Sequence, residues 1–141
     1  MSNEQKITDT EIRWRQRLEN LNKSFKHFES ACNRERYDEL ELAGLVKSYE
    51  LTFELCCKTL KDYLYEEGID VKSPRETIKK AYQTALLENI DLWLAALDRR
   101  NQFSHIYNEK AANETVPYIK ETLYPMIRAG IKILNEKVHE T

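Results

Sequence analysis

The sequence predicts an all-α protein, an up-and-down bundle of four long helices with one additional short helix. Only three glycines and three prolines interrupt the 141 residues, and a third of the residues are charged, which favours helices over strands. Apolar residues recur at alternating steps of three and four, the period of an amphipathic helix. Because the expected connections are short, sequential helices should be antiparallel neighbours.

The length suits one domain with a single core. We expect residues 1–141 to form that one bundle, with frayed ends at 1–8 and 139–141. The formal net charge is −2 and both signs mix along the chain, so broad electrostatic binding to nucleic acid is not indicated, although a small basic site is not excluded. Residues 1–10 lack the apolar core of a signal peptide, and no stretch reaches the length of a membrane span. We therefore expect a cytoplasmic protein without membrane contact.

The three cysteines are expected to be structural. Their odd number does not build a disulfide framework, and no spacing of cysteine and histidine resembles a zinc site. Free cysteine is among the most buried residue types, so Cys32, Cys56 and Cys57 are predicted to be reduced residues of the core. The sequence indicates no cofactor and no set of metal ligands.

The first two expected helices are long. Thr8 and Glu11 have the spacing of a capping box, and a narrow apolar seam follows, which suits packing along another helix. After a polar turn at 33–38, a second helix continues until Gly68, a natural C-terminal stop. Gly44 inside this second helix predicts a close contact with a neighbouring helix.

A short helix and two further helices complete the pattern. Residues 73–76, Ser-Pro-Arg-Glu, combine an N-cap serine, a proline at the first helical position and a glutamate placed to close a capping box. The fourth helix carries Trp93 on its inward face. The polar segment 107–115 predicts a loop, and the last helix follows over 119–138, where Pro125 removes one backbone hydrogen bond and should bend the axis.

The stretch 97–107, LDRRNQFSHIY, concentrates polar chemistry where plain helix would otherwise be expected. Arg100 follows Trp93 by two helical turns, so its side chain should leave the core-facing side of the helix. An unpaired guanidinium is costly there. Arg100 therefore needs either an anionic partner, such as Glu54 or Asp98, or an open cleft.

His105 follows Arg100 by five residues, which is about 140° around an ideal helix, so uninterrupted helix would hold the two side chains apart. Convergence requires the helix to end or distort after Asn101, or each residue to meet its counterpart across the two-fold axis of a dimer. Taken alone, such a histidine is more often structural than catalytic. Arg99 is expected to face the solvent.

The spacing Arg100-x4-His105, with Asn101 directly after the arginine, resembles the Arg-x4-6-His signature of the HEPN superfamily. Members of this superfamily are helical bundles found in prokaryotic toxin and defence ribonucleases. The motif is short, so the resemblance depends on the rest of the chain.

Further segments extend the resemblance. They are FELCCKTLK at 53–61, SPRE at 73–76, Trp93-Leu94, and SHIY at 104–107. Together they make the chain, from residue 14 to residue 134, similar to the nucleotidyltransferase substrate-binding family, the HepT-like partners of separate minimal nucleotidyltransferases. One departure is Cys56-Cys57, where a small residue followed by an aromatic one is expected; it concerns packing rather than the motif.

The resemblance implies a homodimer with the motif near its interface, and a nucleotidyltransferase subunit as partner. HepT-like relatives act as metal-independent ribonuclease toxins, and the partner restrains them by adding adenylate to the tyrosine of Arg-x4-His-x-Tyr. The resemblance therefore implies Arg100 and His105 as catalytic residues, Tyr107 as a possible adenylation site, RNA or a nucleotide as ligand, and no metal.

These residue types suit the cleavage of RNA. An imidazole that titrates near neutrality can take the proton of a ribose 2′-hydroxyl or give one to the leaving oxygen, while a planar guanidinium stabilises charge on the phosphate. Two residues are candidates for a supporting role. Asn101 could orient His105 or the phosphate, and Ser104 could add a hydrogen bond.

Three interpretations are open. The first is a HEPN-type subunit of a toxin-antitoxin-like system that cuts RNA at a homodimer interface. The second is a non-catalytic subunit that binds substrate or nucleotide for the nucleotidyltransferase, in which Arg100 and His105 only grip a phosphate. In the third, the motif is structural and holds the helix end and the dimer seam. Whether the protein is an enzyme depends on which of these holds.

Overall fold

The computed structural model describes residues 8–100 and 109–140, with side chains in the second range described from residue 113 onward. Its helices are α1 (Asp9–Cys32), α2 (Glu39–Glu66), α3 (Pro74–Gln83), α4 (Ile90–Arg99), α5 (Glu109–Tyr118), the π-helical turn η2 (Ile119–Leu123) and α6 (Tyr124–Val138). No strand occurs among the described residues, so the all-α prediction is confirmed. None of the helices in these two ranges is long and apolar enough to cross a membrane.

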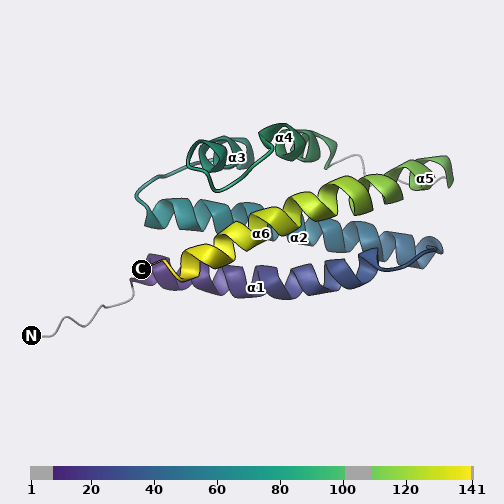
Figure 1. The fold of residues 1–141 in the computed structure, drawn as a ribbon, viewed down its shortest axis with the longest axis horizontal. Coiled ribbons are helices and arrows are strands. Elements are labelled where there is room, and N and C mark those ends of the chain that lie inside the picture. The colour runs from purple at the N-terminus through teal and green to yellow at the C-terminus, as the bar shows by residue number, and fades with distance from the viewer. Residues whose placement is uncertain (1–7, 101–108, 141) are drawn as a thin grey trace, which may run out of the picture.

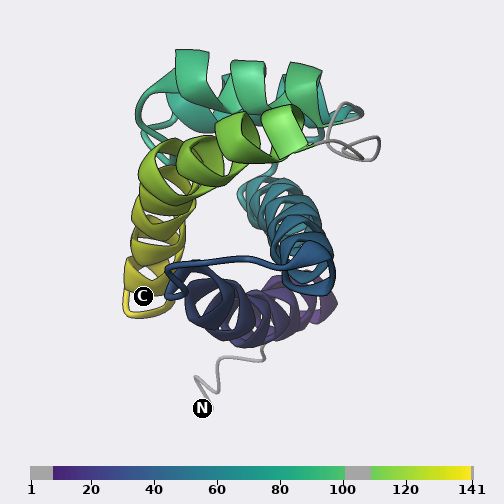
Figure 2. The same ribbon diagram turned by 90° about the vertical axis from the view of Figure 1, so that its right-hand side faces the viewer.

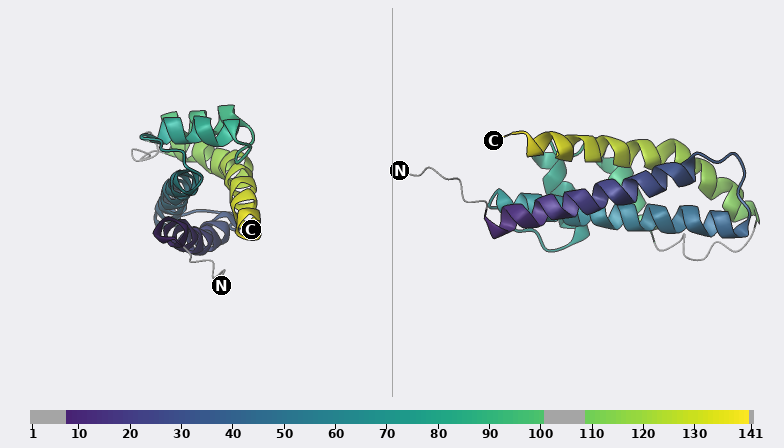
Figure 3. Two further views of the ribbon diagram at one scale, coloured as in Figure 1. Left: turned by 90° about the vertical axis from the view of Figure 1, so that its left-hand side faces the viewer. Right: turned by 90° about the horizontal axis from the view of Figure 1, so that it is seen from below.

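The long helices form a bundle, and two short helices lie across one side of it. Figure 1 shows α1, α2 and α6 running side by side along the long axis, with α3 and α4 above α2. In the end-on view of Figure 2, α3 and α4 run across the direction of the long helices. The elements α5, η2 and α6 follow one another as one continuous ribbon that curves along the bundle (Figure 3). The predicted all-α bundle is confirmed, but α4 spans only ten residues, as α3 does, and lies across the bundle where a fourth long helix running along it was predicted.

A row of buried aromatic rings joins α1, α2 and α4. The ring centroids of Phe28 and Tyr49 are 5.9 Å apart, and those of Tyr49 and Phe53 are 5.8 Å apart. Phe53 in turn stacks on Trp93 at 5.8 Å, with 28° between the ring planes. All four side chains are buried, and such pairs contribute about 0.5–1.5 kcal/mol beyond the burial of their area. The row therefore fixes α4 on α2 two helical turns before Arg100.

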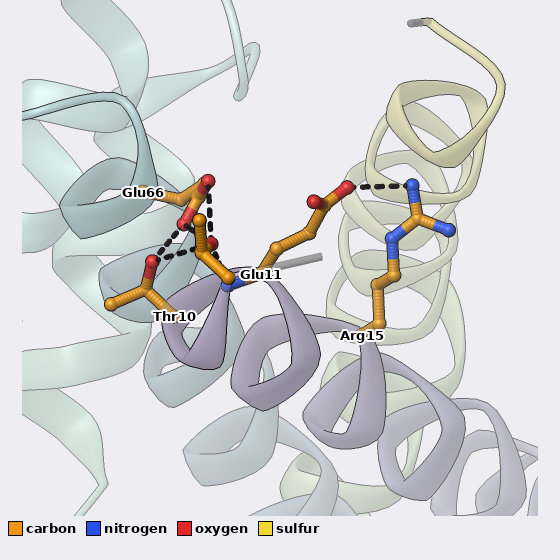
Figure 4. Close-up of polar contacts among 5 residues, drawn as sticks. Thr10, Glu11, Arg15 and Glu66 are labelled. Carbon is orange, nitrogen blue, oxygen red and sulfur yellow. Dashed lines mark hydrogen bonds and ion pairs between the residues drawn. The ribbon is translucent and has the colours of Figure 1, made fainter. Parts of the chain in front are cut away.

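The N-terminus of α1 is capped and tied to the end of α2 (Figure 4). The Thr8 hydroxyl accepts a hydrogen bond from the Glu11 amide at 3.1 Å, as the capping-box spacing predicts. The Glu11 carboxylate does not complete the box, because it pairs instead with Arg15 at 2.9 Å. The hydroxyls of Thr8 and Thr10 both donate to the Glu66 carboxylate in the last turn of α2. These bonds join the start of one long helix to the end of its antiparallel neighbour.

The loop predicted at 107–115 is wrong over most of its length, because α5 already begins at Glu109. The first two residues of the predicted loop lie outside the described residues. Residues 109–112, Glu-Lys-Ala-Ala, are strong helix formers. The polar residues that follow, such as Glu114, are exposed on the helix. Polarity in this segment therefore marks the solvent face of a helix.

The bend predicted at Pro125 takes the form of a π-helical turn. The Tyr124 amide donates to the carbonyl of Ile119, five residues earlier, at the end of η2. Pro125 has no amide hydrogen, and in a regular α-helix its ring would collide with the carbonyl four residues earlier. A wider turn just before the proline relieves this collision.

The close contact predicted at Gly44 is wrong, and Gly130 makes such a contact instead. A Cβ added at Gly44 would meet nothing within 4 Å among the described atoms, because this position is exposed on α2. A Cβ at Gly130 in α6 would lie 2.9 Å from the Trp93 ring and 3.3 Å from Leu87. Gly130 thus lets α6 approach Trp93 closely, and together with Phe53 it fixes the position of α4.

Candidate functional site

Arg100 directly follows α4 and turns toward α2. Its side chain is half-buried and lines a pocket together with Cys57 of α2. This position agrees with the two-turn spacing from Trp93, whose ring is buried in the core. Arg99 is exposed, as predicted, and its guanidinium carbon lies 4.9 Å from the centre of the Tyr118 ring. The two arginines therefore leave the end of α4 in different directions.

The start of α3 forms as its sequence predicts. Ser73 caps the helix by accepting a hydrogen bond from the Glu76 amide at 3.1 Å, and Pro74 occupies the first helical position. The Glu76 carboxylate does not close the box on the capping residue. It accepts instead from the Lys72 amide at 3.0 Å, which fixes the chain entering α3.

An ion pair holds the start of α3 beside Arg100. Arg75 in the first turn of α3 pairs with Asp98 in the last turn of α4. A pocket of about 210 Å³ opens between these two helix ends and α2. It is lined by Glu54, Cys57, Lys58 and Lys61 of α2, by Lys72, Ser73, Pro74 and Thr77, and by Arg100. Residues from the segments 53–61 and 73–76, which carry part of the family resemblance, therefore meet Arg100 at this pocket.

The described residues leave Arg100 without a carboxylate partner. Glu54 pairs with Lys58 at 3.1 Å, and Asp98 pairs with Arg75. No ion pair among the described side chains, those of residues 8–100 and 113–140, includes Arg100. Of the two alternatives that the sequence leaves open, the structure favours the open cleft.

The positive charge of Arg100 lowers the pKa values of two buried side chains of α2, Cys57 and Tyr49, against the larger rise that burial causes. Burial raises the pKa of the Cys57 thiol to about 12, and the Arg100 guanidinium opposes this rise. Burial also raises the pKa of Tyr49 far above its usual value, and the same guanidinium again opposes it. Cys32 and Cys56 are buried as well, with raised pKa values, and all three cysteines are free. The prediction of reduced core thiols is confirmed, because all three side chains are buried and none forms a disulfide.

Four of the predicted site residues, Asn101, Ser104, His105 and Tyr107, lie outside the described residues. Their roles, and the meeting of His105 with Arg100, stay predictions. In the part of the chain that the structure describes, no group of three or more histidine, cysteine, aspartate or glutamate side chains is placed to hold a metal ion.

Sequence patterns alone do not single out the three pocket lysines, Lys58, Lys61 and Lys72. The spacing of residues 54, 57, 58 and 61 is that of one helix face. A helical projection of the 53–61 motif would therefore show Lys58 and Lys61 on the same face of α2. Their closeness to Arg100 depends on how α3 and α4 pack across α2. The result is a small basic site in a chain that has no basic run.

The helical bundle and the meeting of its motifs around Arg100 define a class of protein. Residues 16–136 match the model of the family described as nucleotidyltransferase substrate binding protein like. The chain belongs to this family, and the resemblance predicted from its motifs is confirmed.

Known proteins that are similar to this chain include one curated relative and one solved structure. A protein named probable ribonuclease HepT, from Haemophilus influenzae (strain ATCC 51907 / DSM 11121 / KW20 / Rd), is 25% identical over 87 residues, and the match covers 58% of this chain and 60% of the relative. The chain thus spans about three fifths of the length of that curated relative. A crystal structure of a protein from Thermus thermophilus has a TM-score of 0.71 and 27% sequence identity, and the match covers 82% of this chain and 97% of that chain.

Proposed function

We propose that this chain is the HEPN-type subunit of a two-component nucleotidyltransferase system and that it cuts RNA without a metal ion. The observation that carries the proposal is the half-buried guanidinium of Arg100, which opens on a basic pocket and has no carboxylate partner among the described residues. The similarity to a protein named probable ribonuclease HepT supports the same activity.

Arg100 is suited to bind the phosphate that reacts. A guanidinium presents a planar fork of donors to two phosphate oxygens and keeps its charge at physiological pH. Its place in a pocket wall strengthens this interaction relative to open water. In the proposed reaction, Arg100 stabilises the negative charge that gathers on the phosphate as the ribose 2′-oxygen attacks.

His105 supplies the acid and the base of the proposed reaction. Its neutral imidazole takes the proton of the 2′-hydroxyl, the 2′-oxygen bonds to phosphorus, and the 5′-oxygen of the next nucleotide leaves with a proton. A homodimer brings two copies of the histidine to its interface, so one copy can act as base while the other acts as acid. Asn101 and Ser104 would orient the imidazole and the phosphate.

The proposed partner is a separate minimal nucleotidyltransferase, as the family description suggests. It restrains the ribonuclease by transferring the AMP group of ATP to the Tyr107 hydroxyl, with release of pyrophosphate. The new phosphate, two residues beyond His105, then takes the place of the RNA phosphate at Arg100.

A second function uses the same geometry without cleavage. The family description names substrate binding, and a guanidinium beside a basic pocket also suits the phosphate of a nucleotide that is held for the nucleotidyltransferase. Nucleotide binding by a protein that leaves RNA intact would identify this function.

The experiment is cleavage of total RNA by the purified protein in excess chelator. A His105→Ala variant, purified in parallel, controls for contaminating nucleases, and mass spectrometry first shows that Tyr107 carries no adenylate. We expect cleavage by the wild type and none by this variant. Arg100→Lys keeps the charge but loses the fork, and its rate should fall about 100-fold. No cleavage by unmodified wild type would refute the ribonuclease and leave the binding function.

A further inference from the structure

We propose that the pocket beside Arg100 binds a second phosphate group of the RNA strand, next to the phosphate that reacts, through Lys61 and Lys72. This inference rests on the proposed function, because the pocket would bind the RNA substrate of the proposed ribonuclease beside the phosphate that reacts. Its consequence is that the ligand is a strand with consecutive phosphates, and that both lysines are positioning residues.

The pocket concentrates positive charge in a chain whose net charge is negative. Lys58, Lys61, Lys72 and Arg100 line it, against a single lining carboxylate, that of Glu54. The whole chain has a formal net charge of −2. These cations come from α2, from the segment before α3 and from the end of α4, so only the fold brings them together. A hollow lined mainly by one sign of charge attracts a ligand of the opposite sign.

Two of the lysines are available to such a ligand. Lys61 is exposed and forms no ion pair with any of the described side chains, those of residues 8–100 and 113–140. Lys72 pairs with Asp70 at 2.9 Å, but both side chains are more than half exposed. Exposed ion pairs contribute little to stability, whereas charge-assisted bonds to phosphate are among the strong hydrogen bonds of proteins. A phosphate can therefore draw Lys72 away from Asp70. Lys58 stays as the partner of Glu54 and neutralises the one carboxylate in the wall.

The arrangement along α2 suits a strand. Arg100 shares the pocket wall with Cys57, and Lys61 lies four residues further on, which is about 6 Å along the helix axis. This distance is comparable with the separation of neighbouring phosphates in an extended strand. The pocket volume of about 210 Å³ corresponds to about seven water molecules, which leaves room for a phosphate and part of its ribose.

The experiment measures binding instead of cleavage. The probe is a fluorescein-labelled RNA octanucleotide with 2′-O-methyl groups, which cannot be cut because it has no free 2′-hydroxyl. Fluorescence anisotropy gives its Kd for the full chain, free of adenylate, at increasing NaCl concentration. The logarithm of the binding constant of a single strand falls by about 0.7 per phosphate contact for each tenfold rise in salt.

We expect Lys61→Gln and Lys72→Gln each to make this slope shallower by about 0.7 and to weaken binding about fivefold at 0.1 M NaCl. The matched control is Lys26→Gln, which removes the same charge from an exposed position of α1 outside the pocket. Its slope should equal that of the wild type. Thermal unfolding of each variant shows that the fold is retained.

Unchanged slopes in both pocket variants would overturn the inference, and so would an equal change in Lys26→Gln. AMP and inorganic phosphate serve as competitors that distinguish a strand from a free phosphate compound. If AMP binds as tightly as the octanucleotide and Lys61→Gln weakens both equally, the pocket takes a free nucleotide and the inference is wrong. If the pocket variants lose octanucleotide binding while the wild type does not cleave RNA, the ribonuclease is refuted and the strand-binding pocket is kept.

Discussion

A single methyl group added at Gly130 tests how α4 is held in place. The new Cβ of Gly130→Ala would lie 2.9 Å from the Trp93 ring and 3.3 Å from Leu87. The ring is 1% exposed and stacked on Phe53, so moving it away from the new methyl group would disturb this stacking. Overpacking of this kind costs about 1–3 kcal/mol, while alanine in a helix gains about 1 kcal/mol over glycine. We expect the free energy of unfolding to fall by about 1 kcal/mol.

Urea denaturation followed by circular dichroism measures this change. Gly44→Ala is the matched control, because it makes the same substitution inside an exposed helix where the new Cβ meets nothing within 4 Å of the described structure. It should raise the free energy of unfolding by up to about 1 kcal/mol. In thermal unfolding, the two variants should therefore shift Tm in opposite directions, by about 4 °C for each kcal/mol of change in the free energy of unfolding for a chain of this size. A Gly130→Ala protein at least as stable as the wild type would refute the reasoning, since Trp93 would then adapt at no cost.

Three further predictions concern single groups. Burial raises the pKa of Cys57 from 9.0 to about 12. Because the thiol ionises at lower pH in the unfolded chain than in the folded one, the free energy of unfolding should fall as pH rises from about 9 toward 12. Urea unfolding at pH 8 and pH 10 should show a smaller fall in this free energy for Cys57→Ala than for the wild type. An equal fall would contradict this. Ser73→Ala removes the cap of α3 and should cost about 1 kcal/mol in the same assay; no change would mean that the cap contributes nothing. Tyr124→Phe removes the donor to the Glu29 carboxylate and should cost about 1 kcal/mol, and full retention of stability would show that water replaces this bond.

Features that depend on residues within one helix could be predicted from the sequence. The caps at Thr8 and Ser73 each need only a hydroxyl and an amide three residues later, and both form. The direction of Arg100 follows from its two-turn spacing to Trp93, because the helix between them is regular. The family was also predictable, since its motifs are short local sequences.

Features that depend on packing between distant residues could not be predicted. Gly44 and Gly130 both lie inside helices, and only the position of Trp93 decides which of them makes a close contact. The exposed lysines Lys61 and Lys72 look like ordinary solvated residues until α3 is placed beside Arg100. The roles predicted for Asn101, Ser104, His105 and Tyr107 concern positions outside the described residues, and the predicted homodimer would involve a second copy of the chain; both stay predictions.

The π-helical turn before Pro125 also sets the rotation of the helix that precedes it. A π turn holds one residue more than an α turn, so deleting one residue between 119 and 123 would restore regular winding and rotate α5 against α6 by about 100°. Tyr118 would then leave the Arg99 guanidinium, which lies 4.9 Å from the centre of its ring. The extra residue in η2 therefore sets the rotation of α5 at which Tyr118 contacts Arg99 at the end of α4, next to Arg100.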